Sequence, residues 1–153
     1  MNSLPGTLRP VLLAEDNAND IELILSAFQE AGLANEIVVT RDGYAALNYL
    51  YRREEYAGLN TAPPALVLLD LKMPRMDGRE VLRQIREDSS LRGIPVVVLT
   101  SSKEESDLLQ TYTLGANAYV VKPVAFDDFI GAVGKIGIFW ALLNELPPAS
   151  VSV

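Results

Sequence analysis

Short apolar segments alternate with helix-like segments along this chain, and that alternation limits the fold more than any other feature. Strands are predicted at Val11–Ala14, Glu36–Thr40, Ala65–Leu69, Val96–Leu99 and Ala118–Val121. Each is followed by a segment whose apolar residues recur at helical spacing. Strands that alternate with helices form βαβ units with right-handed crossovers, and strands without polar residues are covered on both faces. The pattern therefore predicts a doubly wound α/β fold around a five-stranded parallel sheet.

The expected helices carry recognisable start signals. Asn17 or Asn19 can cap the first helix, Asp42 caps the second, and Asp77 with Gly78 opens the third. Gly32 is predicted to end the first helix. The last two helices are predicted at 103–114 and 126–144, and a loop is predicted at 57–64.

Composition excludes several classes of protein. The chain has 153 residues, 49% of them hydrophobic, which suits one packed domain. It contains no Cys and no His, so thiol chemistry, zinc–thiolate sites and Ser-His-Asp catalysis are ruled out. A net charge of −7 argues against a nucleic-acid partner. The sequence shows neither a membrane-spanning run nor a signal peptide, so we expect a cytoplasmic protein that is not bound to a membrane.

Four of the predicted strands end in polar residues. The first is followed by Glu15 and Asp16, the third by Asp70, the fourth by Thr100 and the fifth by Lys122. Open α/β sheets bind ligands outside the carboxyl ends of their strands, where the strand order reverses. In the order 2-1-3-4-5 the first and third strands are neighbours, so Asp16 and Asp70 should converge with Glu15 close by.

Three carboxylates in one cleft repel each other, and at least one pKa must rise unless a cation joins them. With only oxygen ligands available, the simplest cation is Mg²⁺, for which Mn²⁺ or Ca²⁺ can substitute. Mg²⁺ is usually bound by one or two carboxylates, so its other coordination positions can take phosphate oxygens. A carboxylate such as Asp70 can form an aspartyl-phosphate. Lys122 and Thr100 could then contact the phosphoryl group, in keeping with the positioning and charge stabilisation that phosphoryl transfer requires. Each residue alone is a weak signal, and the joint placement carries the argument.

The sequence resembles the receiver domains of two-component signalling from about Arg9 to Asn144. The matching motifs are Leu13-Ala14-Glu15-Asp16-Asn17, Leu68-Leu69-Asp70-Leu71-Lys72-Met73-Pro74-Arg75-Met76-Asp77-Gly78, Val97-Val98-Leu99-Thr100-Ser101-Ser102 and Tyr119-Val120-Val121-Lys122-Pro123. The resemblance implies the flavodoxin-like receiver fold and a signalling protein that is not an enzyme in the usual sense. Its phosphoryl group would come from a sensor histidine kinase.

The resemblance also implies a role for each matching residue. Asp70 would be the phospho-acceptor, and its metal would be held directly by Asp16 and Asp70. Glu15 would contact the metal through a bound water, and the Lys72 backbone carbonyl would be a further ligand. Thr100 and Tyr119 would be the switch residues. Lys122 would contact the phosphoryl group, and the Lys122–Pro123 bond would be cis.

The 57–64 loop and the closing Phe139-Trp140 and Leu146-Pro147-Pro148 segments resemble the single-domain response regulators of bacterial phytochromes. We therefore expect a flexible N-terminus at 1–8, a receiver domain at 9–145 and a tail at 146–153. Lys72 stands where that subfamily more usually has Asn, so the resemblance leaves the dephosphorylation rate open.

The last predicted helix is apolar almost all round at positions 138–143, which is more than packing on the sheet requires. Trp and Phe are favoured anchors in protein interfaces. We therefore expect a homodimer through the fifth strand and its flanking helices, with Phe139 and Trp140 in the interface.

Three other interpretations remain open at this point. A haloacid-dehalogenase-type phosphatase would also use Asp70 and Mg²⁺, but it would need an Asp where Lys72 stands. A flavodoxin-like nucleotide-binding module would share the fold, but the first turn after Ala14 has two acids and no glycine. A pseudo-receiver would bind partners without being phosphorylated.

Overall fold

The computed structural model describes residues 9–101, 110 and 112–136. Its centre is one parallel sheet of five strands in the order β2-β1-β3-β4-β5, as the sequence predicts. The strands are β1 (Val11–Ala14), β2 (Ile37–Thr40), β3 (Leu66–Asp70), β4 (Val96–Thr100) and β5 (Ala118–Val121). The doubly wound, flavodoxin-like α/β fold is therefore confirmed.

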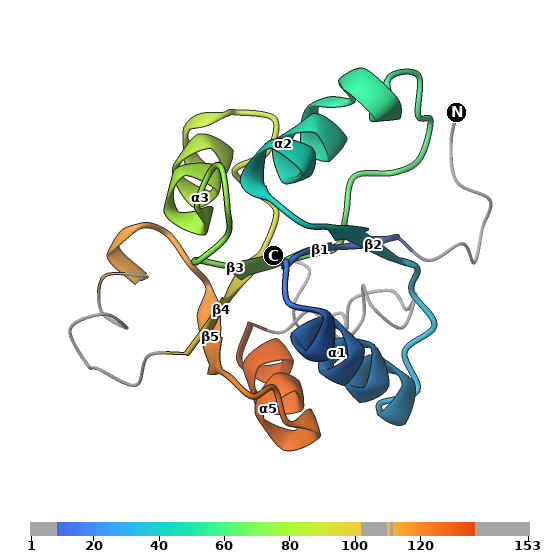
Figure 1. The fold of residues 1–153 in the computed structure, drawn as a ribbon, viewed down its shortest axis with the longest axis vertical. Helices are drawn as coiled ribbons and strands as arrows, with labels where there is room; N and C mark the ends of the chain where they lie inside the picture. The colour runs from blue at the N-terminus through green and yellow to red at the C-terminus, as the bar shows by residue number, and fades with distance from the viewer. Residues whose placement is uncertain (1–8, 102–109, 111, 137–153) are drawn as a thin grey trace, which may run out of the picture.

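Helices cover both faces of the sheet (Figure 1). On one face lie α2 (Gly43–Tyr51) and α3 (Gly78–Glu87), and on the other lie α1 (Ala18–Glu30) and α5 (Phe126–Ile136). A short 3-10 helix, η1 (Glu54–Tyr56), follows α2 before the predicted 57–64 loop. Most of the helix predicted at 103–114, and the part of the last helix beyond Ile136, lie outside the described residues.

Two buried clusters form the core, one on each face of the sheet. Val11 and Leu13 pack among residues of α1 and α5, whereas Leu12 and Ala14 pack among residues of α2 and α3. Successive strand residues point to opposite faces, so a strand that is covered on both sides must be apolar throughout. This explains why β1, β3 and β4 are buried along their whole length.

Short polar side chains fix where the helices begin. The Asn17 side chain accepts a hydrogen bond from the Asp20 backbone N–H, so Asn17 is the cap and Asn19 is not. Asp42 and Asp77 cap α2 and α3 in the same way. Gly32 has a φ of 72°, just beyond the end of α1, where a residue without Cβ adopts this conformation readily.

Three strands differ from prediction by one residue at one or both ends, and β4 is one of them because it extends to Thr100. β2 begins at Ile37 and β3 runs from Leu66 to Asp70, so Asp70 is the last residue of its strand. Among the described helices, none has the length and apolar character needed to cross a membrane.

Candidate functional site

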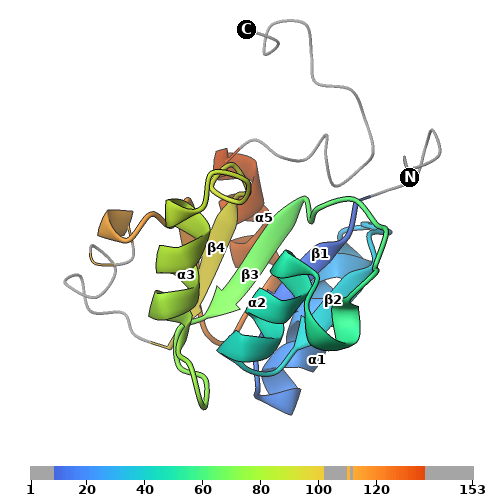
Figure 2. The ribbon, with the colours of Figure 1, turned by 90° about the horizontal axis from the view of Figure 1, so that it is seen from above.

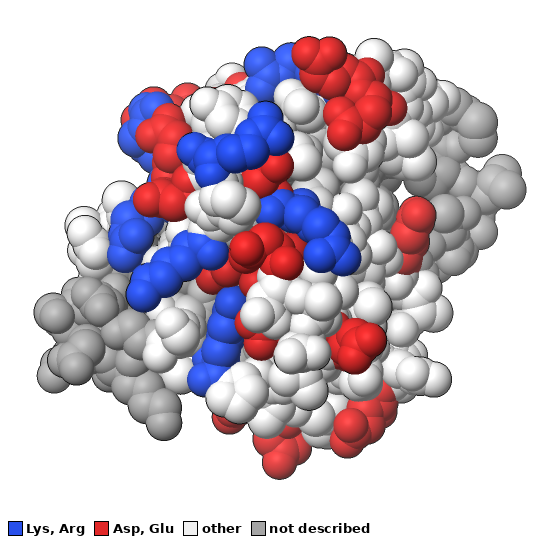
Figure 3. Space-filling model, in the orientation of Figure 1, with Lys and Arg blue, Asp and Glu red and all other residues white. Residues whose placement is uncertain are grey.

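The sheet brings Glu15, Asp16 and Asp70 together at the carboxyl ends of β1 and β3. These strands are paired with Ala14 opposite Leu69, so the residues that follow are neighbours. One ligand oxygen from each carboxylate can be chosen so that all three lie within 4.8 Å of one another. Glu15 and Asp70 are buried, and Asp16 is exposed. In Figure 2 the β3 arrow shows the strand direction, and Figure 3 shows acidic side chains at the centre of the face where the strands end, bordered by Lys and Arg.

Lys122, directly after β5, reaches into this acidic group. Its Nζ lies 2.8 Å from Glu15 Oε1 and 3.2 Å from Asp70 Oδ2. A third carboxylate, Asp20 Oδ2, lies 3.1 Å away. The Lys122–Pro123 peptide bond is cis. The structure thus joins the ends of β1, β3 and β5 through one ammonium group.

Burial raises the pKa of Glu15 to about 7; the negative charge of Asp70 adds to this rise, while the hydrogen bond from Lys122 opposes it. The sequence predicted that one pKa in the group would rise, but burial contributes more than the neighbouring carboxylate. For Lys122, burial acts to lower the pKa, but its contacts with Glu15, Asp70 and Asp20 raise that pKa above its ordinary value. The ammonium therefore stays charged and offsets part of the acidic repulsion.

The loop after β3 is tied to the Asp70 carboxylate. The Lys72 backbone N–H donates to Asp70 Oδ1 at 3.2 Å. The Gly78 N–H donates to the Leu71 carbonyl at 2.9 Å, which folds the loop back against the end of the strand. The Lys72 main chain therefore lies beside the carboxylate group.

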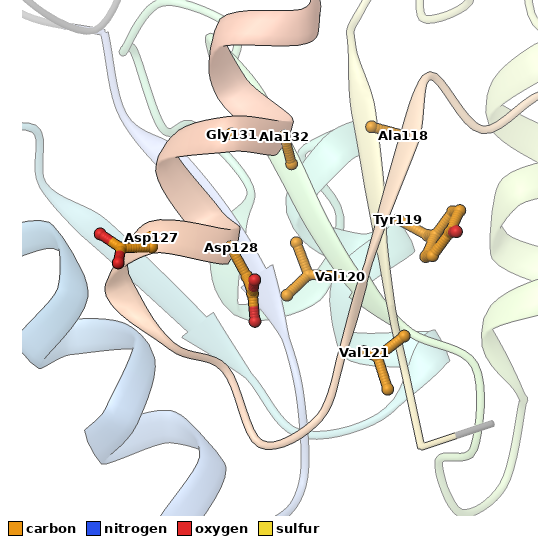
Figure 4. Close-up of a pocket in the computed structure, with 8 residues that line it drawn as sticks. All are labelled: Ala118, Tyr119, Val120, Val121, Asp127, Asp128, Gly131 and Ala132. Atoms are coloured by element: carbon orange, nitrogen blue, oxygen red, sulfur yellow. The ribbon is translucent and has the colours of Figure 1, made fainter. Parts of the chain in front are cut away.

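The predicted switch residues lie on the next two strands. Thr100 ends β4, is buried, and follows Leu99, which is paired with Asp70. Its carbonyl accepts the Lys122 N–H at 2.7 Å. The Tyr119 side chain points to the opposite side of β5 from Val120 (Figure 4), and its ring meets that of Tyr112 edge-on with 5.7 Å between centroids.

Sequence reasoning missed Asp20. This residue lies in the first turn of α1, where an acid is common because it interacts favourably with the helix dipole. Its contact with Lys122 needed the tertiary structure, because the two residues are far apart in the chain.

The donor set suits a hard divalent cation. Three carboxylates supply only oxygen atoms, and such ligands favour Mg²⁺, Mn²⁺ or Ca²⁺ over softer metals. Glu15 and Asp70 are held in place by Asn17 and Lys72 backbone N–H groups, so two of the three ligands are already positioned. Phe139 and Trp140, predicted as interface residues, lie outside the described residues.

Comparisons with known proteins match this chain to a family and to several relatives. The family model described as "Response regulator receiver domain" matches residues 11–134. A probable methanogenesis regulatory protein, FilR2 of Methanothrix harundinacea, is 43% identical over 137 residues, covering 90% of this chain and 86% of FilR2. Response regulator Rcp1 of Synechocystis is 39% identical over 139 residues, covering 91% of this chain and 93% of Rcp1.

Solved structures give the same result. The bacteriophytochrome response regulator RtBRR has 53% identity and a TM-score of 0.82, with 93% of this chain and 85% of RtBRR covered. The bacteriophytochrome response regulator AtBRR has 55% identity and a TM-score of 0.81, with 90% and 99% covered. The Mn²⁺-bound form of Rcp1 has 38% identity and a TM-score of 0.73, with 92% and 99% covered. With its acidic site at the ends of β1 and β3 and a family match over most of its length, this chain belongs to the response regulator receiver domain family.

Proposed function

We propose that this protein is a phosphorylation-controlled response regulator in which Asp70 accepts a phosphoryl group from a histidine kinase in a Mg²⁺-dependent reaction. The observation that carries the proposal is the position of the Asp70 carboxylate. Its Oδ2 lies 3.2 Å from the Lys122 ammonium, and the carboxylate groups with those of Glu15 and Asp16 at the end of the sheet. A nucleophile in contact with a cation and grouped with a set of metal ligands suits phosphoryl transfer, which depends on positioning and charge stabilisation.

In the proposed reaction an Asp70 carboxylate oxygen forms a bond to phosphorus while the phosphorus–nitrogen bond of a phosphohistidine breaks. The bonding electrons return to the imidazole nitrogen, and the product on this chain is an acyl phosphate. Lys122 is close enough to contact a phosphoryl oxygen after a small movement. The Thr100 hydroxyl, on the strand beside β3, can contact another.

Asp16 and Asp70 would hold Mg²⁺ directly, with Glu15 acting through a bound water and the Lys72 carbonyl as a further ligand. When bound, Mg²⁺ supplies positive charge that offsets both the acidic group and the incoming phosphoryl oxygens. Mn²⁺ or Ca²⁺ could substitute, since each binds the same oxygen ligands.

Phosphorylation would shift the population between two packings of Thr100 and Tyr119. Tyr119 is half-buried against Tyr112, so a different rotamer would change the surface beside β5. A ligand shifts such an equilibrium only through contacts that differ between the two states. Contact between the phosphoryl group and Thr100 would supply that difference.

The phosphodonor we propose is a bacterial phytochrome kinase, because two similar solved structures are bacteriophytochrome response regulators. We further propose a flexible segment at 1–8, a receiver domain at 9–145 and a tail at 146–153. A cytoplasmic location belongs to the same proposal, since histidine kinases use cytoplasmic ATP.

A homodimer through the β5 side completes the proposal. Among the described strands β5 is an edge strand, and edge strands offer unpaired backbone groups to a partner. The described residues leave a groove of about 380 Å³ between β5 and α5 (Figure 4), with Asp127 and Asp128 at one end. The predicted contacts of Phe139 and Trp140 would lie on this side.

Chemical labelling tests the acceptor role. The protein is incubated with Mg²⁺ and acetyl phosphate, and the intact mass is measured. We expect one added phosphoryl group that is removed by hydroxylamine, absent from Asp70→Asn and retained in the control Asp127→Asn. Normal hydroxylamine-sensitive labelling of Asp70→Asn would refute the assignment, and an unlabelled wild type would favour the pseudo-receiver interpretation.

A further inference from the structure

Lys122 has as many carboxylate neighbours as it has hydrogens to donate. Its ammonium carries three N–H groups. Glu15, Asp20 and Asp70 each place a carboxylate oxygen within 3.2 Å of Nζ. The Lys122 side chain is only 14% exposed, which leaves little access for water. A phosphoryl oxygen on Asp70 would therefore compete with these carboxylates for the Lys122 ammonium.

The three carboxylates differ in how easily they can release Lys122. The Glu15 side chain is fully buried, and its other oxygen accepts the Asn17 N–H at 3.1 Å. Asp70 carries the phosphoryl group and stays in place. The Asp20 side chain is 18% exposed at the first turn of α1, so a change of rotamer can return it to water. Leaving a charge buried and unpaired costs far more than separating a pair whose members can be hydrated.

We infer that Asp20 is a positioning residue that shares Lys122 with Asp70 and competes for it with a phosphoryl group on Asp70. This inference rests on the proposed function. In the unmodified protein the Asp20–Lys122 pair stabilises the arrangement seen in the structure. Phosphorylation separates the pair, so the pair opposes the phosphorylated state and sets how readily it forms.

An alternative role for Asp20 is purely structural. An acid in the first turn stabilises a helix through its dipole, with no involvement of Lys122. A second alternative is direct repulsion between the Asp20 carboxylate and the phosphoryl group. The two alternatives and the inference predict different effects of replacing Asp20 when variants with and without Lys122 are compared.

Beryllofluoride, which mimics a phosphoryl group on a carboxylate, provides the test at saturating Mg²⁺. We expect Asp20→Asn to bind it about two- to fivefold more tightly than wild type, the range for loss of a partly exposed ion pair. Glu22→Gln is the matched control, because it removes an exposed negative charge from the same helix. That variant should bind within about 1.5-fold of wild type, as expected for a surface change.

The same substitution in a Lys122→Gln background completes a double-mutant cycle. There Asp20→Asn should change the affinity by less than about 1.5-fold, because the competition for Lys122 is gone. With acetyl phosphate, Asp20→Asn should raise the maximum labelling rate and leave the half-saturating concentration nearly unchanged. A helix-dipole role would move neither quantity.

Unchanged or weaker beryllofluoride binding by Asp20→Asn would overturn the inference. An equal gain with and without Lys122 would also overturn it, in favour of direct repulsion. If Asp20→Asn does not fold, Asp20→Ser removes the same carboxylate and serves in its place. A wild type that neither binds beryllofluoride nor is labelled would refute the proposed function itself. That result differs from the two outcomes that would overturn the inference about Asp20.

Discussion

Gly78 lies so close to Asp70 that a Cβ atom at position 78 would overlap the Asp70 carbonyl oxygen. The contact is made as α3 begins, where the Gly78 N–H also donates to Leu71. Backbone atoms cannot move aside as a flexible side chain can. The first turn of α3 and the end of β3 are therefore packed at a distance that only glycine permits.

We predict that Gly78→Ala lowers the free energy of unfolding by about 1–3 kcal/mol, the usual cost of overpacking. The shift at Asp70 should also weaken Mg²⁺ binding. Chemical denaturation and calorimetric titration measure the two effects. Gly131→Ala in α5 is the control: among the described residues, no atom outside the adjoining helix backbone lies within 4 Å of the added Cβ, and alanine should stabilise the helix by about 0.5–1 kcal/mol. Wild-type stability in Gly78→Ala would contradict the close contact.

Arg86 of α3 donates hydrogen bonds both to the segment between α3 and β4 and to the segment just before β5. It donates to the carbonyls of Gly115, Arg92 and Ile94, and to the Asn117 side chain, at 2.7–3.0 Å. Asn117 Oδ1 also accepts the Val96 N–H, so the same group holds the start of β4. The guanidinium is partly buried, which lowers the pKa of Arg86 without removing its charge.

We predict that Arg86→Met lowers the free energy of unfolding by about 1–3 kcal/mol, because these acceptors lose their donor. Methionine keeps most of the apolar stem, so the loss reports on the hydrogen bonds. Arg83→Met is the matched control on the same helix, where exposed ion pairs with Glu80 and Glu87 contribute little. Urea denaturation of both variants should separate them clearly. Equal stabilities would show that the Arg86 network is not a main support of the fold.

Mg²⁺ should stabilise the folded protein through the acidic group. A ligand present at ten times its dissociation constant adds about 1.4 kcal/mol to the free energy of unfolding. We expect this gain in wild type and in Asp127→Asn, and a much smaller one at the same concentration in Asp16→Asn. Thermal melts with EDTA and with Mg²⁺ provide the measurement. A full Mg²⁺ response in Asp16→Asn would place the metal elsewhere.

For the proposed dimer, sedimentation at micromolar concentration should show a dimer for wild type. Replacing Phe139 and Trp140 together with Asp should give a folded monomer, because charges at the centre of an apolar interface prevent association. The control is Leu25→Asp, an exposed apolar position on α1, which should remain dimeric. A monomeric wild type, both with and without beryllofluoride, would refute the dimer.

Local chemistry explains why much of the fold could be predicted. The strands are buried on both faces, so their apolar runs are visible without a partner segment. The caps Asn17, Asp42 and Asp77 act within three residues of their own positions, so they too are readable in the sequence. The carboxyl ends of parallel strands all lie on the same side of the sheet. The grouping of Glu15, Asp16 and Asp70 therefore followed from the strand order.

Contacts between distant side chains needed the tertiary structure. The sequence placed Lys122 near Asp70, but not among three carboxylates, because the position of Asp20 depends on how α1 packs on the sheet beside α5. It gave no sign of the Arg86 network, since backbone carbonyls carry no sequence signal. Periodicity and capping are local properties of the chain, whereas the partners of a buried charge are set by how separate elements pack. The sequence therefore determined the sheet and the acidic group at the carboxyl ends of its strands. The tertiary structure decided which carboxylates contact Lys122.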